Sequence, residues 1–204
     1  MTERLLRLQA LLRAAAPALV ALATATVLAA VALNFMLARP AAAVRSERRS
    51  AVATGTMLGF FALLFLLLRF QLGAVRLSPW LADLLLDAGL GLVLLGAGVN
   101  VAGRLTLGGL WGNHVVLYRD HALVCTGVFR WVRHPLYASL IWMAAGAACV
   151  FGNPAALAAT LGIFLPAMVF RARQEEAALS SLFPGYAAYR RRTGMLVPRP
   201  WSHR

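Results

Sequence analysis

Charged and aromatic side chains that could bind a polar ligand stand together at the start of an apolar run in the second half of the chain. Arg133, His134 and Tyr137 surround Pro135, a residue suited to the first turn of a helix. A helix N-terminus offers free backbone N–H groups and partial positive charge to an anion. The same residue types also anchor helices at a membrane interface. The sequence therefore predicts a helix start here, with ligand binding and interfacial anchoring both open.

A second group follows about forty residues later. Glu175 and Glu176 are two of only seven acidic residues in the chain. Arg171 and Arg173 precede them by two to five positions, so a helix would bring all four within about one and a half turns. One interpretation is that a Glu holds a cationic group and an Arg holds an anionic one. The other is a solvated helix face with local ion pairs, worth about 0.3–0.5 kcal/mol each.

Other reactive side chains show no catalytic or metal-binding pattern. His114, Asp120 and His121 fit no metal motif, and we expect loop or surface positions for them. Cys125 and Cys149 form neither a disulfide framework nor a metal spacing, so we expect two reduced thiols and no metal site.

The composition excludes a water-soluble globule. Of 204 residues, 61% are hydrophobic and only 13% are charged, whereas soluble domains are about 25% charged. Disorder is excluded too, because it requires low hydrophobicity. The 20 basic residues are all arginine and give a net charge of +13. In a soluble protein this charge would suggest nucleic acid. Here the arginines separate long apolar runs, which is typical of a membrane protein without a nucleic-acid partner.

Long uncharged stretches predict the membrane helices. The first three are residues 14–38, 50–68 and 80–103, each near the roughly 20 residues that cross a bilayer core. The 35 uncharged residues 136–170 would form a helix of about 52 Å, too long for one crossing. Gly152-Asn153-Pro154 is a turn signal in its middle, so we predict a tight hairpin of helices 136–151 and 154–170.

The sequence thus predicts an all-α integral membrane protein with about five transmembrane helices. Pro166 is expected to bend the last one, and Pro184-Gly185 to end its polar extension. In the third helix, small residues predict close helix packing; they are Gly89, Gly91, Gly96 and Gly98. Asp83 and Asp87, near its outer end, are expected to be interfacial and solvated.

Arginine counts predict the orientation. Segments 39–49, 104–133 and 171–204 would share one side and carry four, four and seven arginines, against three and two for the N-terminus and the 69–79 loop. The positive-inside rule then puts the C-terminus in the cytoplasm, where Arg190-Arg191-Arg192 suits an anionic leaflet. We divide the chain into an N-terminal helical region, 1–103, and a region 104–204 that contains the candidate chemistry. The apolar 104–133 loop is expected to fold back on the membrane or cover a site.

From about Leu107-Gly108 onward, the chain resembles the isoprenylcysteine carboxyl methyltransferase family, part of a wider group with phospholipid N-methyltransferases. The resemblance rests on the order and spacing of several motifs, namely His121-Ala-Leu-Val, Thr126-Gly127-Val128-Phe129, Arg133-His134-Pro135-Leu136-Tyr137, the Asn153-Pro154 turn, Phe170-Arg171-Ala-Arg-Gln-Glu175-Glu176, Leu179, Phe183, Tyr186, Tyr189 and Pro198. Two positions depart from the pattern: Phe129 replaces a usual Tyr, and Ser139 replaces a frequent Gly.

The resemblance implies S-adenosylmethionine as methyl donor, bound at the cytoplasmic end of the last helices. The cofactor-binding residues that it implies are Leu123, Gly127, Arg133, His134, Pro135, Tyr137, Glu175 and Glu176. It implies catalytic roles for Arg171 and Glu176, and a lipophilic acceptor that enters from the bilayer.

Carboxyl O-methylation of an isoprenylcysteine-like acid is the leading interpretation. A carboxylate is already ionised at neutral pH and needs no general base. The alternative is N-methylation of phosphatidylethanolamine, whose amine would first lose a proton to Glu175, Glu176 or His134. Remoter alternatives are an NADPH-dependent membrane reductase, since some sterol reductases resemble this architecture, and a non-enzymatic membrane protein.

Overall fold

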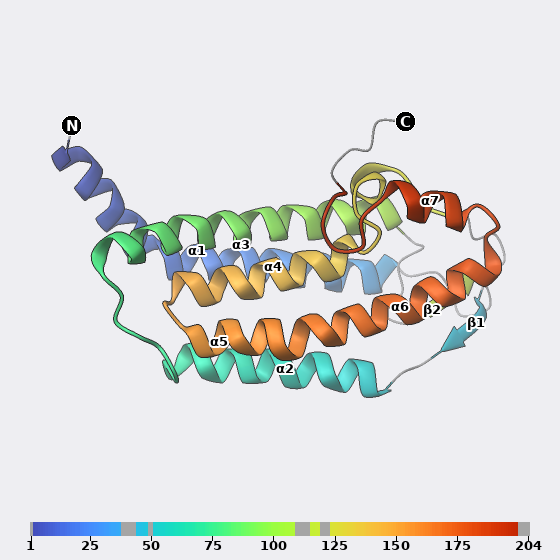
Figure 1. The fold of residues 1–204 in the computed structure, drawn as a ribbon, viewed down its shortest axis with the longest axis horizontal. Coiled ribbons are helices and arrows are strands. Elements are labelled where there is room, and N and C mark those ends of the chain that lie inside the picture. The colour runs from blue at the N-terminus through green and yellow to red at the C-terminus, as the bar shows by residue number, and fades with distance from the viewer. Residues whose placement is uncertain (1, 38–43, 49–50, 109–114, 119–122, 200–204) are drawn as a thin grey trace.

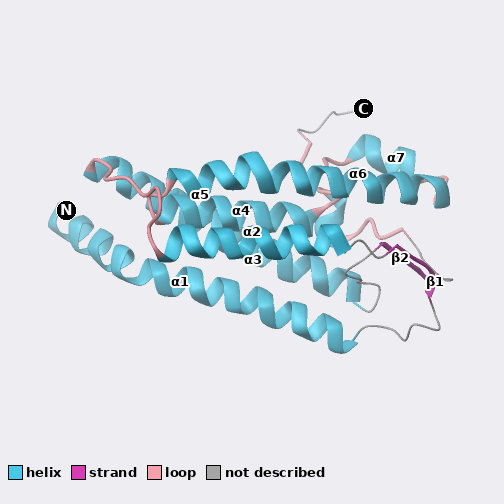
Figure 2. Cartoon of the chain, turned by 90° about the horizontal axis from the view of Figure 1, so that it is seen from below, coloured by secondary structure: helices cyan, strands magenta, loops and turns pink. Residues whose placement is uncertain are grey.

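The computed structural model describes residues 2–37, 44–48, 51–108, 115–118 and 123–199. Long helices lie side by side in a bundle, with the two strands and the short last helix at one end (Figures 1 and 2). The α-helices are α1 (Thr2–Leu37), α2 (Ala51–Arg69), α3 (Pro79–Leu107), α4 (Pro135–Val150), α5 (Pro154–Ala159), α6 (Leu165–Leu182) and α7 (Tyr186–Arg192). A 3-10 helix, Gly127–Arg130, precedes α4, and a π-helix, Thr160–Phe164, joins α5 to α6.

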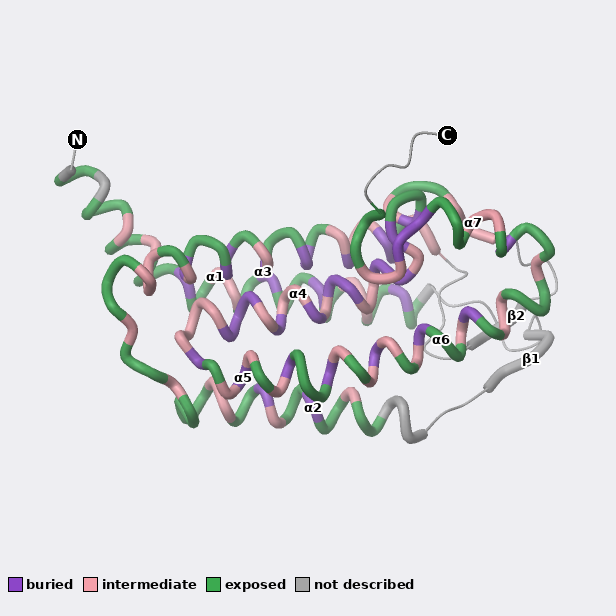
Figure 3. Tube along the Cα trace, viewed as in Figure 1, coloured by how far each residue is buried: buried purple, intermediate pink, exposed green. Residues whose placement is uncertain are grey.

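The length and apolar composition of the described helices are those of a membrane protein. Three are long and apolar enough to cross a bilayer, namely Leu6–Met36, Pro79–Leu107 and Pro154–Leu182, and two shorter apolar helices cover Gly55–Arg69 and Pro135–Val150. Exposed residues run along the helices of the bundle (Figure 3). Many of them are large and apolar, among them Leu22, Leu28 and Phe65. Such a surface suits lipid rather than water.

The all-α prediction needs one correction. Strands β1 (Val44–Arg48) and β2 (Val115–Tyr118) form an antiparallel two-stranded sheet. Both lie in segments that we expected to be loops. The sequence Val-Val-Leu-Tyr of β2 is rich in the β-branched and aromatic residues that favour strands.

The predicted hairpin is confirmed at its turn. Gly152 adopts a left-handed φ of 55°, and Asn153 accepts a hydrogen bond from the backbone N–H of Ala156 at 2.9 Å. The Asn153 amide also donates to the carbonyl oxygens of Leu67 and Leu72, each at 3.1 Å. The turn therefore caps α5 and fastens the hairpin to the end of α2.

Two other helix predictions are confirmed. Pro135 is the first residue of α4, and the helical extension after residue 170 ends at Leu182, before Pro184. At the predicted bend, Pro166 is the second residue of α6 and lies two positions after the π-helical turn Thr160–Phe164. Since proline lacks the N–H that an α-turn would use, a locally widened turn accommodates it.

The third helix packs closely on α4, as its glycines predict, but only two of the four named glycines take part. A Cβ on Gly89 would lie 2.6 Å from the Gly146 carbonyl oxygen, and one on Gly96 would lie 2.8 Å from the Ser139 carbonyl oxygen. Gly91 and Gly98 face open space, so the packing prediction is wrong for them. The helix also continues beyond its predicted end, to Leu107.

The first helix packs along α3 through small and branched side chains, with Ala23 and Val27 against Val93 and Ala97. At the N-terminal ends of these helices, Arg13 Nη2 lies 2.6 Å from Asp83 Oδ1. The Gln9 amide donates to Asp87 at 3.0 Å. Asp87 is exposed and Asp83 is half-buried, so both reach solvent as expected, and each also has a partner on α1.

Candidate active site

The segment that precedes α4 is held in place by the chain that follows α7. The backbone N–H of Arg133 donates to the carbonyl oxygen of Gly194 at 2.8 Å, and that of His134 donates to Met195 at 3.1 Å. Val132 and Gly194 also form a parallel bridge. These bonds fix the N-terminal end of α4 against the segment that follows α7.

Glu176 is the centre of a buried ionic cluster. It is only 4% exposed. Its Oε1 accepts from Arg133 Nε at 2.7 Å and lies 3.2 Å from His134 Nε2, while Oε2 lies 3.5 Å from Arg190 Nε. Burying a carboxylate is costly unless it is paired and hydrogen-bonded, and three basic side chains provide that pairing.

Arg133 also joins this cluster to the end of α7. Its Nη1 donates to the carbonyl oxygen of Arg190 at 3.1 Å and to that of Thr193. Carbonyl oxygens at a helix C-terminus lack partners within the helix, so the guanidinium caps α7 while it binds Glu176.

Glu175 faces a different set of partners. The Tyr137 hydroxyl donates to its Oε1, and Arg171 Nε lies 3.6 Å from the same oxygen. The Arg171 guanidinium also stands 5.5 Å above the Tyr137 ring and donates to Met57 Sδ of α2 at 3.3 Å. The adjacent glutamates thus divide the site into a Glu176 side towards α7 and a Glu175 side towards α2.

His134 lies between the two carboxylates. Its Nδ1 is 3.5 Å from Glu175 Oε2, and its Nε2 is 3.2 Å from Glu176 Oε1. Burial alone would lower the pKa of His134, but hydrogen bonds and the negative charges of both glutamates outweigh it and raise the pKa above its ordinary value. The environment therefore favours the imidazolium, which bridges the two halves of the site.

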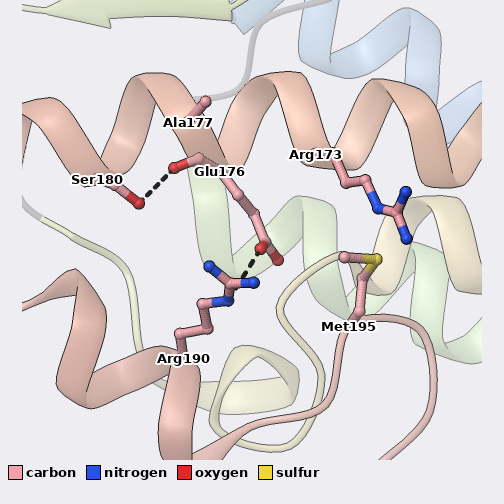
Figure 4. Close-up of a pocket in the computed structure, with 6 residues that line it drawn as sticks. All are labelled: Arg173, Glu176, Ala177, Ser180, Arg190 and Met195. Atoms are coloured by element: carbon pink, nitrogen blue, oxygen red, sulfur yellow. Dashed lines mark hydrogen bonds and ion pairs between the residues drawn. The ribbon is translucent and has the colours of Figure 1, made fainter.

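A cleft of about 300 Å³ opens on the Glu176 side. It is lined by Arg173, Glu176, Ala177, Ser180, Arg190 and Met195. Arg173 and Arg190 lie on either side of the Glu176 side chain (Figure 4). The cleft thus presents both signs of charge, which suits a zwitterionic ligand.

The structure brings most of the predicted site residues together. They are Arg133, His134, Pro135, Tyr137, Arg171, Glu175 and Glu176. Since Glu176 is buried, the interpretation of this segment as a solvated helix face is wrong at that residue. It holds in part at Glu175, which makes the local i,i+4 pair with Arg171.

Leu123 and Gly127 lie apart from the described lining of the cleft. Leu123 is half-buried in the segment that leads to the 3-10 helix. Gly127 has a φ of 55°, and a Cβ there would lie 2.7 Å from Thr106 Oγ1 of α3. Their assignment to the cofactor stays a prediction. His114, Asp120 and His121 lie outside the described residues.

Sequence reasoning gave no site role to several residues of this region, although Tyr186 and Tyr189 belong to the motifs of the family resemblance. Arg190 was assigned to lipid contact because it opens a run of three arginines. Tyr186 is buried, and its hydroxyl has no hydrogen-bond partner among the described residues. Tyr189 donates to the Phe129 carbonyl oxygen at 2.6 Å. Asn100 and Arg104 form a further buried polar group on α3, for which the charge of Arg104 at the end of an apolar run was an available signal.

Known proteins are similar to the part of the chain that contains this cluster. Residues 89–181 match the sequence model of the isoprenylcysteine carboxyl methyltransferase (ICMT) family. The Protein-S-isoprenylcysteine O-methyltransferase of Saccharomyces cerevisiae is 32% identical over 111 residues, which cover 52% of this chain and 46% of that protein. The cobalt-zinc-cadmium resistance protein CzcN of Cupriavidus metallidurans is 32% identical over 126 residues, covering 60% and 53%.

A solved structure has a similar fold. It is the eukaryotic intramembrane Ras methyltransferase ICMT, with a TM-score of 0.50 and 24% identity over 74% of this chain and 53% of that one. The chain spans about half the length of the curated relatives that it matches.

Proposed function

The chain belongs to the isoprenylcysteine carboxyl methyltransferase family, and from this premise we propose that it transfers the methyl group of S-adenosylmethionine to a lipophilic acceptor in the membrane. The observation that carries the proposal is the cluster of Arg133, His134 and Tyr137 around Glu175 and Glu176, inside the matched region. Such a concentration of buried, mutually paired charges is typical of a functional site.

The side chains at the cleft fit the charges of S-adenosylmethionine. Glu176 suits its ammonium group, and Arg173 or Arg190 suits its carboxylate. The Tyr186 phenol keeps its proton, because burial and the neighbouring Glu176 raise its pKa. It is thus an unused hydrogen-bond donor beside the cluster. When bound, S-adenosylmethionine supplies an electrophilic methyl group on a sulfonium.

The acceptor is proposed to approach from the Glu175 side. Arg171 contacts Met57 of α2 there, and it would orient an acceptor carboxylate by charge-assisted hydrogen bonds. The bound donor would supply its methyl group to a carboxylate oxygen held by Arg171, which would give a methyl ester with the donor's neutral thioether as leaving group. The main contribution of the protein is to hold the acceptor carboxylate and the methyl donor in line.

The chemistry of the cluster favours a carboxylate acceptor over an amine. An amine would have to lose a proton to a nearby base. The raised pKa of His134 favours the protonated ring, and both glutamates are held in ion pairs. Phosphatidylethanolamine N-methylation remains the second candidate, because the wider group includes such enzymes. A reductase would differ from both methyltransferases in its cofactor, because it would bind NADPH in place of S-adenosylmethionine.

We further propose that the site faces the cytoplasm, in a bacterial inner membrane. The arginine distribution supports this orientation. The division into helices 1–103 and a methyltransferase region 104–204 is likewise a proposal, supported by the positions of the motifs. No nucleic-acid partner is proposed.

Cofactor binding tests the proposal. Purified protein in detergent should bind S-adenosylmethionine in titration calorimetry, and Arg190→Ala should weaken that binding. Arg4→Ala, at the opposite end of the bundle, is the matched control and should bind like the unaltered protein. Tight NADPH binding without S-adenosylmethionine binding would instead favour a reductase, and no binding of either would contradict the enzyme proposal.

A further inference from the structure

A second buried polar group lies between α3 and α4, outside the cleft. Asn100 and Ser139 are fully buried, and Arg104 is 7% exposed. Polar side chains within membrane helices are costly and usually have a definite partner or task. None of these three belongs to the set implied by the family resemblance.

These side chains form a directed series of hydrogen bonds. Arg104 Nε donates to Asn100 Oδ1, Asn100 Nδ2 donates to Ser139 Oγ, and Ser139 Oγ donates to the carbonyl oxygen of Leu136, each at 2.8 Å. The series starts on α3 and ends in the first turn of α4. Leu136 stands between His134 and Tyr137, the two residues of this turn that contact the glutamates.

Because α3 packs closely on α4, this series of hydrogen bonds can fix the position of α4. A Cβ on Gly96 would lie 2.8 Å from the Ser139 carbonyl oxygen, and one on Gly103 would lie 3.0 Å from Leu136 Cδ2. The two helices are therefore in direct contact at this level. Small displacements of a catalytic or binding group are costly, because such sites need placement to within about 0.5 Å.

We propose that Asn100, Arg104 and Ser139 are positioning residues, which hold the first turn of α4 so that His134 and Tyr137 reach Glu176 and Glu175. The inference rests on the proposed function, since the site that they position is the proposed cofactor site. Ser139 stands where related sequences often have glycine, so the link through its hydroxyl is a feature of this chain. The series acts through α4 and touches neither reactant.

Ser139→Ala and Asn100→Leu both remove the hydrogen bond between α3 and α4. Ser139→Ala also removes the bond to Leu136, and Asn100→Leu the bond from Arg104. Thr160→Val is the matched control, because it removes another fully buried hydroxyl, which donates to the Ala156 carbonyl oxygen at 2.8 Å. The dissociation constant for S-adenosylmethionine is measured on the folded fraction of each variant. We expect at least about tenfold weaker binding for Ser139→Ala, as is typical when an outer-shell partner is lost, and no change for Thr160→Val.

A second readout needs no cofactor. The pKa of His134 is followed by NMR of labelled protein. Glu175 and Glu176 of α6 face its ring. Arg133 and Tyr137 lie beside the ring, and Arg171 and Arg190 lie on the far side of the two carboxylates. Displacement of α4 would carry the ring away from both glutamates, so its pKa should fall in Ser139→Ala and Asn100→Leu but not in Thr160→Val.

The outcomes separate this inference from the proposed function. Unchanged cofactor affinity and an unchanged His134 pKa in a folded Ser139→Ala variant would overturn the positioning role. If the unaltered protein did not bind S-adenosylmethionine, the proposed function would fail. The His134 titration would still decide whether the series positions α4: a lowered pKa supports it, and an unchanged pKa refutes it.

Discussion

At the scale of single residues, the charge of Glu176 holds the cluster together. Its carboxylate pairs with the adjacent Arg133 and His134 before α4 and with Arg190 of α7. Removing one partner of a buried ion pair leaves the other uncompensated, at a cost of about 3–5 kcal/mol. The amide of a glutamine would keep the shape while it loses the charge.

We therefore expect Glu176→Gln to lower the melting temperature and to weaken S-adenosylmethionine binding by about tenfold or more, since hydrogen bonds to charged groups contribute about 1.5–3 kcal/mol. Thermal unfolding and titration calorimetry measure the two effects. Glu3→Gln is the control, because its pair with Arg7 is solvent-exposed and such pairs contribute little. Equal behaviour of the two variants would refute the assignment of Glu176.

Arg171 should affect the acceptor more than the cofactor. It lies on the Glu175 side, against Met57. We expect Arg171→Gln to lower kcat or raise the KM for the acceptor by at least about tenfold, with the dissociation constant for S-adenosylmethionine changed less than threefold. A large loss of cofactor affinity would instead move Arg171 to the cofactor half of the site.

The raised pKa of His134 predicts a pH dependence of stability. The folded protein binds this proton more tightly than the unfolded chain, whose histidine pKa is about 6.5. The resulting stabilisation is fully present below about pH 6.5 and is lost as the pH rises through the higher folded pKa. The difference in melting temperature between the unaltered protein and His134→Asn should therefore shrink as the pH increases. A difference that is constant or grows with pH would contradict the raised pKa.

Residue types and spacing were sufficient to find the main site residues, because the two motifs combine two of the seven acids of the chain with His134 and several arginines. They were insufficient for Asn100 and Ser139, whose partnership joins positions 39 apart. Such a bond follows from how two helices pack, which no local pattern records. The role of Arg190 also depends on its contact with a buried acid, and a run of arginines alone suggests lipid.

At the scale of elements, the contact of α3 with α4 sets the geometry of the site. The apolar runs predicted the helices well, because membrane helices need long uncharged stretches. The extension of α3 to Leu107 was missed because Arg104 was treated as a boundary, although its side chain turns into the protein. The β1–β2 pair was missed because each strand is short and its partner is far away in sequence.

Glycine substitutions test the packing of these helices. A Cβ on Gly96 would meet the Ser139 carbonyl oxygen at 2.8 Å, whereas one on Gly98 would meet nothing within 4 Å. We expect Gly96→Ala to destabilise the protein by about 1–3 kcal/mol through overpacking, and Gly98→Ala to be neutral. Unfolding in denaturant compares them, and a neutral Gly96→Ala would mean that α3 and α4 are less closely packed than described.

At the scale of the whole molecule, the site lies at the end of an apolar bundle where α7, β1 and β2 are found (Figure 1). A water-soluble methyl donor and a lipophilic acceptor could both reach such a place, one from the aqueous side and one from the bilayer. This arrangement accounts for paired charges at the membrane boundary. The acceptor's identity depends on the bilayer-facing side and does not follow from the motifs.

The proposed orientation has its own test. The C-terminal segment 171–204 carries seven arginines, so the positive-inside rule predicts that it is cytoplasmic. A C-terminal green fluorescent protein fusion should fluoresce in bacterial cells, and a C-terminal alkaline phosphatase fusion should be inactive. The reverse pattern would place the site on the other side of the membrane.

Carboxyl methylation of a lipophilic acceptor is tested most directly by the fate of a transferred methyl group. Membranes that contain the protein are incubated with methyl-labelled S-adenosylmethionine, and the extracted lipids are treated with mild alkali, with Glu176→Gln membranes as the blank. We predict label in the lipid extract that alkali releases as methanol, because a carboxyl methyl ester is hydrolysed under these conditions. Label that stays on the lipid after alkali would contradict carboxyl methylation and identify an N-methyltransferase.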